Sequence, residues 1–120
     1  VLFAVVLAAH SKSPRVLAID NFDHALNPRL ARALIAKICA WVPAISAEKQ
    51  LLLTTHNPLV LDGLPLDNDA VRLFAVDRSR NGHTVVNRVL IDQDAFQKNG
   101  ELWTVSRMWI HGCFGGVPDV

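Results

Sequence analysis

Short apolar runs that end in polar turns dominate the first half of the chain. Residues 1–10 are apolar almost throughout, which favours a buried helix, and residues 11–14 then break the pattern. Residues 15–19 are rich in aliphatic side chains, as in a buried parallel strand, and the run ends on the carboxylate of Asp20. Two interpretations follow: an acid placed for use at the tip of a strand, or an Asp that simply forms a turn.

An amphipathic helix is predicted after this turn. Asn27 and Pro28 are typical of a helix start, because Asn caps well and Pro loses no hydrogen bond at the first helical position. Apolar side chains then recur at helical spacing, namely Leu30, Leu34, Ile38 and Trp41. We expect the helix to end near Pro43.

A second apolar run, residues 51–53, is followed by the polar residues 54–56. A strand, a helix and a strand at this spacing predict a βαβ unit, in which the two strands run parallel through a right-handed crossover. The C-terminal ends of parallel strands meet at one edge of the sheet, so we expect Asp20 and His56 at the same edge. A histidine at the end of a strand can also have a purely structural role.

The second half of the chain has the pattern of a hairpin with helices around it. Residues 59–61 predict a short helix, residues 71–76 and 83–91 predict strands, and Asn81-Gly82 between these strands is a hairpin signal. We expect the sheet to finish with this antiparallel ribbon. Residues 92–98 and 101–109 are predicted to be helical, and residues 115–118 to be a tail. Core or interface positions are expected for Trp41, Trp103 and Trp109.

Composition narrows the possible function classes. The 120 residues carry 12 basic and 11 acidic side chains, a net charge of +1, so charge gives no support for nucleic-acid binding. The apolar run at residues 1–9 is too short to span a bilayer. Cys39 and Cys113 fit no paired metal-ligand spacing and are expected to be reduced thiols in a cytosolic protein. His111 beside Cys113 supplies too few ligands for a metal site.

Two motifs carry a family resemblance: residues 15–28, RVLAIDNFDHALNP, and residues 51–64, LLLTTHNPLVLDGL. Together they resemble the Walker B and switch-histidine strands of an ATP-binding-cassette-type P-loop ATPase domain. The likeness is closest to soluble AAA-type ATPases that share this core with the RecF and overcoming-lysogenization-defect families. The resemblance implies an α/β fold, namely the C-terminal half of such a domain, with a parallel βαβ core, helices on both faces and a C-terminal antiparallel ribbon.

The resemblance also implies roles for individual residues. Asp20 matches the residue that helps to hold Mg²⁺, and His56 matches the residue that contacts the γ-phosphate of ATP or the attacking water. Asn21 stands where the family usually has the glutamate that polarises this water, and an amide can orient a water but cannot take its proton. Asp23 matches a second acid of this turn and could compensate. The alternative for Asp23 is an exposed acid that the dipole of the following helix favours.

The resemblance also implies features of the full-length protein. Leu26, Asn27 and Pro28 match the D-loop, which faces a partner subunit, so a homodimer that sandwiches ATP is implied for the full-length protein. The chain lacks a Gly-x-x-x-x-Gly-Lys-Ser/Thr phosphate loop and a Ser-Gly signature motif, so we interpret residues 1–120 as the C-terminal portion of one ATPase domain. The expected function is ATP binding and Mg²⁺-dependent ATP hydrolysis in a longer cytoplasmic protein. The alternatives are a non-hydrolysing nucleotide-dependent switch or scaffold, and an inactive truncated remnant.

Overall fold

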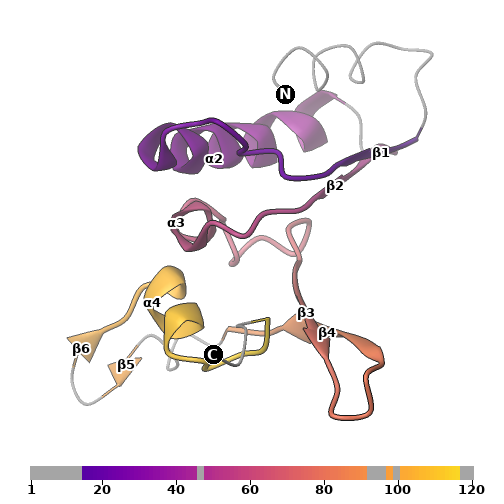
Figure 1. The fold of residues 1–120 in the computed structure, drawn as a ribbon. Helices are drawn as coiled ribbons and strands as arrows, with labels where there is room; N and C mark the ends of the chain where they lie inside the picture. Colours follow the sequence, from indigo (N-terminus) through magenta and orange to yellow (C-terminus); the bar gives the residue numbers. More distant parts are fainter. Residues whose placement is uncertain (1–14, 46–47, 92–96, 99–100, 117–120) are drawn as a thin grey trace. The chain divides into compact units, whose positions relative to one another are not determined.

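The computed structural model describes residues 15–45, 48–91, 97–98 and 101–116 of the 120-residue chain. The chain divides into two compact units, Val1–Pro65 and Leu66–Val120, which we call the N-terminal unit and the C-terminal unit. Each unit has its own strands and helices (Figure 1). The helix predicted at residues 1–10 lies outside the described residues.

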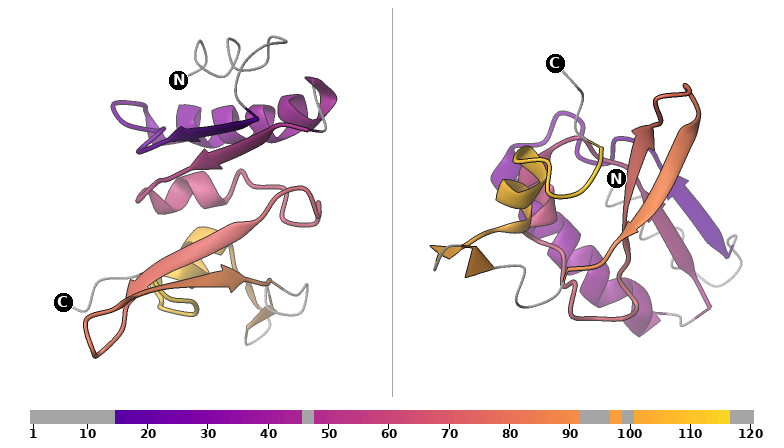
Figure 2. Two further views of the ribbon diagram at one scale, coloured as in Figure 1. Left: turned by 90° about the vertical axis from the view of Figure 1, so that its right-hand side faces the viewer. Right: turned by 90° about the horizontal axis from the view of Figure 1, so that it is seen from below.

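A parallel strand pair and its crossover helix form the N-terminal unit. Strand β1 (Val16–Ile19) pairs with strand β2 (Gln50–Leu53), in a register that sets Ile19 opposite Leu53. Helix α2 (Pro28–Ile45) connects the two strands, and the short helix α3 (Pro58–Leu61) follows β2. The two strands lie side by side and point the same way (Figure 2, left). The predicted βαβ unit is therefore confirmed, with both strands ending at one edge.

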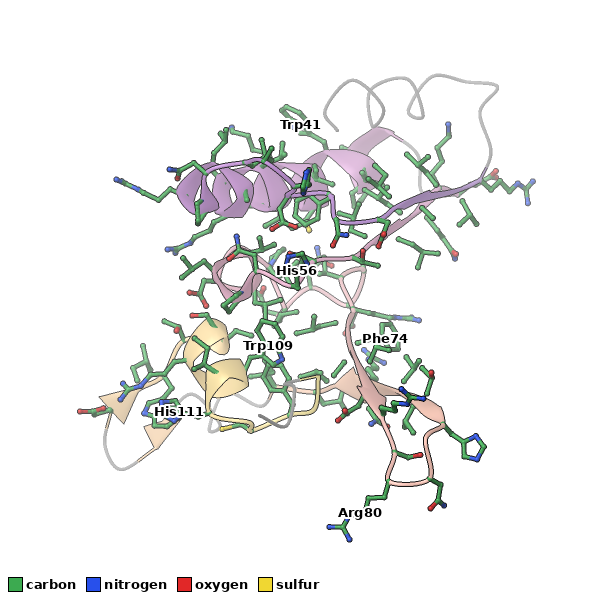
Figure 3. The ribbon with its side chains drawn as sticks, viewed as in Figure 1. Trp41, His56, Phe74, Arg80, Trp109 and His111 are labelled. Atoms are coloured by element: carbon green, nitrogen blue, oxygen red, sulfur yellow. The ribbon has the colours of Figure 1, made fainter. Side chains whose placement is uncertain are left out.

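The buried stripe of helix α2 overlaps the predicted one at Leu34 and Ile38 but differs at other positions. Ala31, Ile35 and Ile38 are buried, whereas Leu30 is exposed. Trp41 is 42% exposed, and Figure 3 shows it on the side of α2 that faces away from α3. The predicted buried face was wrong for Leu30, because helical spacing fits two neighbouring stripes equally well and tertiary packing selects between them. Trp41 is not a core residue, and its alternative position at an interface stays a prediction.

Close packing of α3 against α2 is what selects the buried stripe. Gly63 follows α3, and a Cβ atom at this position would collide with the backbone carbonyl of Arg32 and come within 2.7 Å of the Ile35 Cγ2 atom. Glycine is therefore required at residue 63 for the two helices to approach. The small Ala31 side chain is fully buried in the core cluster of this unit.

Two features mark the C-terminal part of α2. The helix continues through Pro43 to Ile45, two residues beyond the predicted end, because a proline in the last turn removes one hydrogen bond without stopping the helix.

Cys39 is half-buried, and this burial raises the pKa of its thiol. The thiol stays protonated at neutral pH, so Cys39 is poorly suited to act as a nucleophile.

The core of the N-terminal unit lies between the helices and one face of the strand pair. Its buried members are Phe22, Ala31, Ile35 and Val60. Partly buried residues packed against them are Ile19, Leu26, Leu34, Cys39, Leu53 and Leu64. On the opposite face of the pair, Val16 and Leu52 are exposed. Parallel sheets usually carry helices on both faces. Among the described residues, helices cover one face of the strand pair, so a helical layer on the other face stays a prediction.

An antiparallel hairpin opens the C-terminal unit. Strand β3 (Leu73–Arg78) pairs with strand β4 (Thr84–Val89), and Gly82 in the connecting turn has a φ angle of 80°. The predicted hairpin is confirmed. It forms a two-stranded sheet of its own, however, and does not extend the sheet of β1 and β2 as predicted. The Asn81-Gly82 signal is local, so it predicts the ribbon but not the sheet that the ribbon joins.

The end of the C-terminal unit departs most from the prediction. Strand β5 (Gln97–Lys98) pairs with strand β6 (Glu101–Leu102), and helix α4 (Val105–Ile110) follows. The predicted helices at residues 92–98 and 101–109 are therefore wrong at both short strands, while residues 92–96 lie outside the described residues. Thr104 caps α4, because its Oγ1 atom accepts a hydrogen bond of 3.2 Å from the backbone N–H of Arg107.

Side-chain stacking supports α4 from one side. The Arg107 guanidinium lies 4.4 Å from the ring centroid of Trp103, and the ring of His111 lies 4.8 Å from the same tryptophan. Trp103 and Trp109 are both half-buried, in agreement with the packing role that we predicted for them. Within the described part of the chain, no helix has the length and hydropathy needed to cross a membrane.

Candidate functional site

The candidate site is the edge where β1 and β2 end. Strand pairing continues past both strands, because the Thr54 N–H donates to the Ile19 carbonyl at 3.1 Å and the Phe22 N–H donates to the Thr54 carbonyl at 3.2 Å. These two bonds hold the turn after β1 directly against the first residue after β2. Asp20 and Asn21 are therefore fixed by the sheet, although both side chains are exposed.

Thr54 connects the polar groups of the two strand ends. Its Oγ1 atom accepts a hydrogen bond of 2.8 Å from the Asn21 N–H. The same hydroxyl donates to the Oδ1 atom of Asp20. One hydroxyl thus orients the Asp20 carboxylate and holds the backbone of the next residue, which leaves the other carboxylate oxygen for a ligand. Thr54 was not among the predicted site residues, but its place directly opposite Asp20 follows from the parallel register.

Asn21 turns its side chain toward His56. Its backbone is left-handed, with a φ angle of 46°, a conformation that Asn adopts more readily than most residues. The Asn21 Oδ1 atom lies 3.1 Å from the Nδ1 atom of His56, a hydrogen-bond distance. Figure 3 shows His56 just beyond the end of β2. The expectation that Asp20 and His56 share one sheet edge is confirmed, and Thr54 and Asn21 lie between them.

The segment after β2 holds His56 through local hydrogen bonds. The Thr55 Oγ1 atom accepts a hydrogen bond of 3.1 Å from the Asn57 N–H. Asn57 in turn caps α3, because its Oδ1 atom accepts a hydrogen bond of 3.2 Å from the Leu59 N–H. His56 therefore lies between a strand and a capped helix. The Asn57-Pro58 pair before the apolar residues 59–61 is typical of such a cap.

Asp23 is the one buried acid of the candidate site. Its side chain is only 8% exposed, and its Oδ1 atom has no hydrogen-bond partner among the described residues. The alternative of an exposed acid at a helix N-terminus is therefore wrong. Burial of an unpaired oxygen of a charged group costs free energy, so this position of Oδ1 does not stabilise the N-terminal unit.

Replacement of Asp23 by asparagine is expected to stabilise the chain. The amide has nearly the same shape but carries no charge, so the free energy of unfolding should rise by about 1 kcal/mol. Urea denaturation of both proteins at pH 7 measures this difference. A clear loss of stability would instead show that the carboxylate has a partner outside the described residues.

Leu26, Asn27 and Pro28 form the junction between the acidic turn and α2. The Asn27 Oδ1 atom accepts a hydrogen bond of 3.0 Å from the Arg29 N–H, and the Asn27 carbonyl accepts one of 2.9 Å from the Ala31 N–H. The predicted helix start is confirmed. Leu26 is half-buried against the core, whereas Asn27 and Pro28 are exposed, as a contact with a partner subunit would require.

The chemistry of the edge suits Mg²⁺. This ion prefers oxygen ligands, and it is usually held by one or two carboxylates together with water and the phosphates of a substrate. Asp20 offers one oriented carboxylate at an exposed strand tip. No group of three or more His, Cys, Asp or Glu side chains in the described part of the chain could hold a metal by itself. Asp20 therefore fits a Mg²⁺ ion whose other ligands are water and the phosphates of a bound substrate.

The described residues form an α/β fold in which two parallel strands end at one polar edge. Residues 1–62 match the model of a family described as "AAA domain, putative AbiEii toxin, Type IV TA system". The match covers half of the chain, including both strand ends, and the chain belongs to this family of AAA domains. No curated protein matches the chain, and no solved structure does.

Proposed function

We propose that the edge formed by β1 and β2 binds the phosphates of Mg²⁺-ATP and hydrolyses ATP. The observation that carries this proposal is the continuous set of hydrogen bonds from Asp20 through Thr54 and Asn21 to His56. It places an oriented carboxylate and an imidazole at the C-terminal ends of neighbouring parallel strands, which is where ligands bind in open α/β sheets. Membership of the AAA-domain family supports nucleotide as the ligand.

Each residue of the edge has a proposed role in this reaction. Asp20 would hold Mg²⁺, as the Walker B aspartate does in the ATP-binding-cassette-type ATPases that the motif resembles, and a bound ion would supply neutralisation of charge on the terminal phosphates. His56 contacts the γ-phosphate or the attacking water. Thr54 keeps the Asp20 carboxylate in one orientation, so that little ordering is needed when the ligand binds.

The rest of the ATPase is proposed to come from a longer protein. A phosphate-binding loop and a signature motif would complete the nucleotide site, and residues 26–28 would face a second subunit across it. The exposed Asn27 and Pro28 side chains leave this junction accessible. The likeness to the RecF and overcoming-lysogenization-defect families supports the same arrangement, in which two domains close around ATP and move an attached domain.

A non-hydrolysing switch is the second candidate function. The observation that favours it is Asn21, whose amide replaces the usual glutamate and contacts His56. An amide cannot accept a proton from water, so ATP could be bound and sensed without being cut. In this case ATP would still drive dimerisation, and the release of phosphate would be negligible.

Titration calorimetry and phosphate release on the full-length protein test the proposal. We expect ATP to bind more tightly with Mg²⁺ than with EDTA, and phosphate to be released with turnover. The 120 residues alone should bind ATP weakly, because they contain no phosphate-binding loop. Binding without phosphate release would select the switch, and the absence of any ATP binding by the full-length protein would overturn both candidates.

A further inference from the structure

The hydrogen bond between Asn21 and His56 decides which ring nitrogen of the histidine carries the proton. A neutral imidazole has one N–H donor and one lone-pair acceptor, and the bond made by one nitrogen fixes the state of the other. The atom of Asn21 that faces Nδ1 is the carbonyl oxygen, at 3.1 Å, and this atom can only accept. Nδ1 therefore carries the hydrogen, and Nε2 carries the lone pair.

The second nitrogen of His56 is left for a ligand. The side chain is exposed, and no hydrogen bond joins Nε2 to any residue that the structure describes. A lone pair at this position can accept a hydrogen from water, whereas it would be repelled by an anionic phosphate oxygen. The resemblance allows His56 to contact either the γ-phosphate or the attacking water. The Nδ1–H tautomer favours the contact with water.

We propose that Asn21 is a positioning residue that holds His56 in the Nδ1–H tautomer, and that His56 Nε2 is the general base of this ATPase. This inference rests on the proposed function. In the step, Nε2 takes one proton from water while the water oxygen forms a bond to the γ-phosphorus. The bond between this phosphorus and the β–γ bridging oxygen breaks, and its electron pair leaves with ADP. The imidazolium then returns its proton to the solvent.

The backbone around Asn21 prepares the residue for this role. Its left-handed φ angle of 46° and the hydrogen bond of its N–H to Thr54 fix the direction in which the side chain leaves the turn. A carboxylate at residue 21 would accept the proton itself. The Asn21 amide cannot accept a proton, so the neighbouring His56 ring is the proton acceptor. Hydrolysis is therefore compatible with asparagine in place of the glutamate that the family usually has.

Nitrogen-15 NMR of the histidine rings tests the tautomer without any need for activity. In the full-length protein labelled at histidine, above the pH at which imidazoles are protonated, we expect the ring proton of His56 on Nδ1. Asn21→Gly removes the side chain but accepts the positive φ, and it should release His56 into a mixture of tautomers like that of the exposed His83. Asn21→Asp keeps an acceptor and should restore the Nδ1–H form.

Turnover of the same variants tests the role of the base. Asn21→Gly should lower phosphate release, and His56→Gln should lower it by about 10²–10⁴-fold. A wild-type His56 with its proton on Nε2 would overturn the proposal, as would an Asn21→Gly variant with a changed tautomer and unchanged turnover. A protein that shows the Nδ1–H tautomer but binds no ATP would contradict the proposed function and leave the positioning role of Asn21 supported.

Discussion

Replacing Asp20 by alanine is expected to reduce the proposed Mg²⁺-dependent ATP hydrolysis of the full-length protein by at least about 100-fold, because a metal ligand supplies several kcal/mol of transition-state stabilisation. The substitution removes the one carboxylate that the edge of β1 and β2 orients, and it frees the Thr54 hydroxyl. A phosphate-release assay over a range of Mg²⁺ concentrations measures the effect. Asp20 is exposed, so the variant should remain folded.

Two further variants separate the role of the carboxylate from general charge effects. Asp67→Ala removes an exposed acid of the C-terminal unit and should leave turnover unchanged. Thr54→Val keeps the carboxylate but removes the hydroxyl that holds it, so a smaller loss of activity is expected than for Asp20→Ala. Turnover of the Asp20→Ala variant equal to that of wild type would exclude Asp20 as the magnesium residue.

The βαβ core was predictable because its signals are local. The strands contain the apolar runs 16–19 and 51–53, the helix starts at an Asn-Pro cap, and the connection geometry dictates parallel strands. Asp20 follows the first run directly and His56 lies three residues after the end of the second, so their common edge needed no tertiary information. The hairpin of β3 and β4 was predictable for the same reason, since a two-residue turn signal lies close to the strands that it joins.

Features that depend on contacts between distant residues were missed. The choice of buried stripe on α2 depends on the approach of α3 at Gly63, which the spacing of apolar residues does not contain. The hydroxyl of Thr54 contacts Asp20 from the other strand, 34 residues away in sequence. The burial of Asp23 depends on how the whole turn folds against the core. Sequence patterns therefore indicated which residues reach the edge, but not the hydrogen bonds that organise them.

The turn after β1 contains residues of the candidate site and one residue of the core, Phe22. The position of the site therefore depends on the packing of the core. Phe22 lies between Asn21 and Asp23, and its side chain is 1% exposed in the core of the N-terminal unit. Its backbone N–H also donates to the Thr54 carbonyl. Phe22 therefore anchors the turn that carries Asp20 and Asn21, so the core determines the orientation of this turn.

Replacing Phe22 by alanine is expected to lower the free energy of unfolding by about 3–5 kcal/mol, because removal of a buried ring loses its transfer free energy and leaves a cavity. Urea denaturation of the 120-residue chain measures the loss. Phe74→Ala is the matched control, since Phe74 on β3 is 49% exposed and should cost much less. Equal losses for the two variants would show that Phe22 does not hold the turn. In the full-length protein, Phe22→Ala should also reduce Mg²⁺-dependent ATP binding at temperatures where the protein stays folded, because Asp20 and Asn21 lose their fixed position.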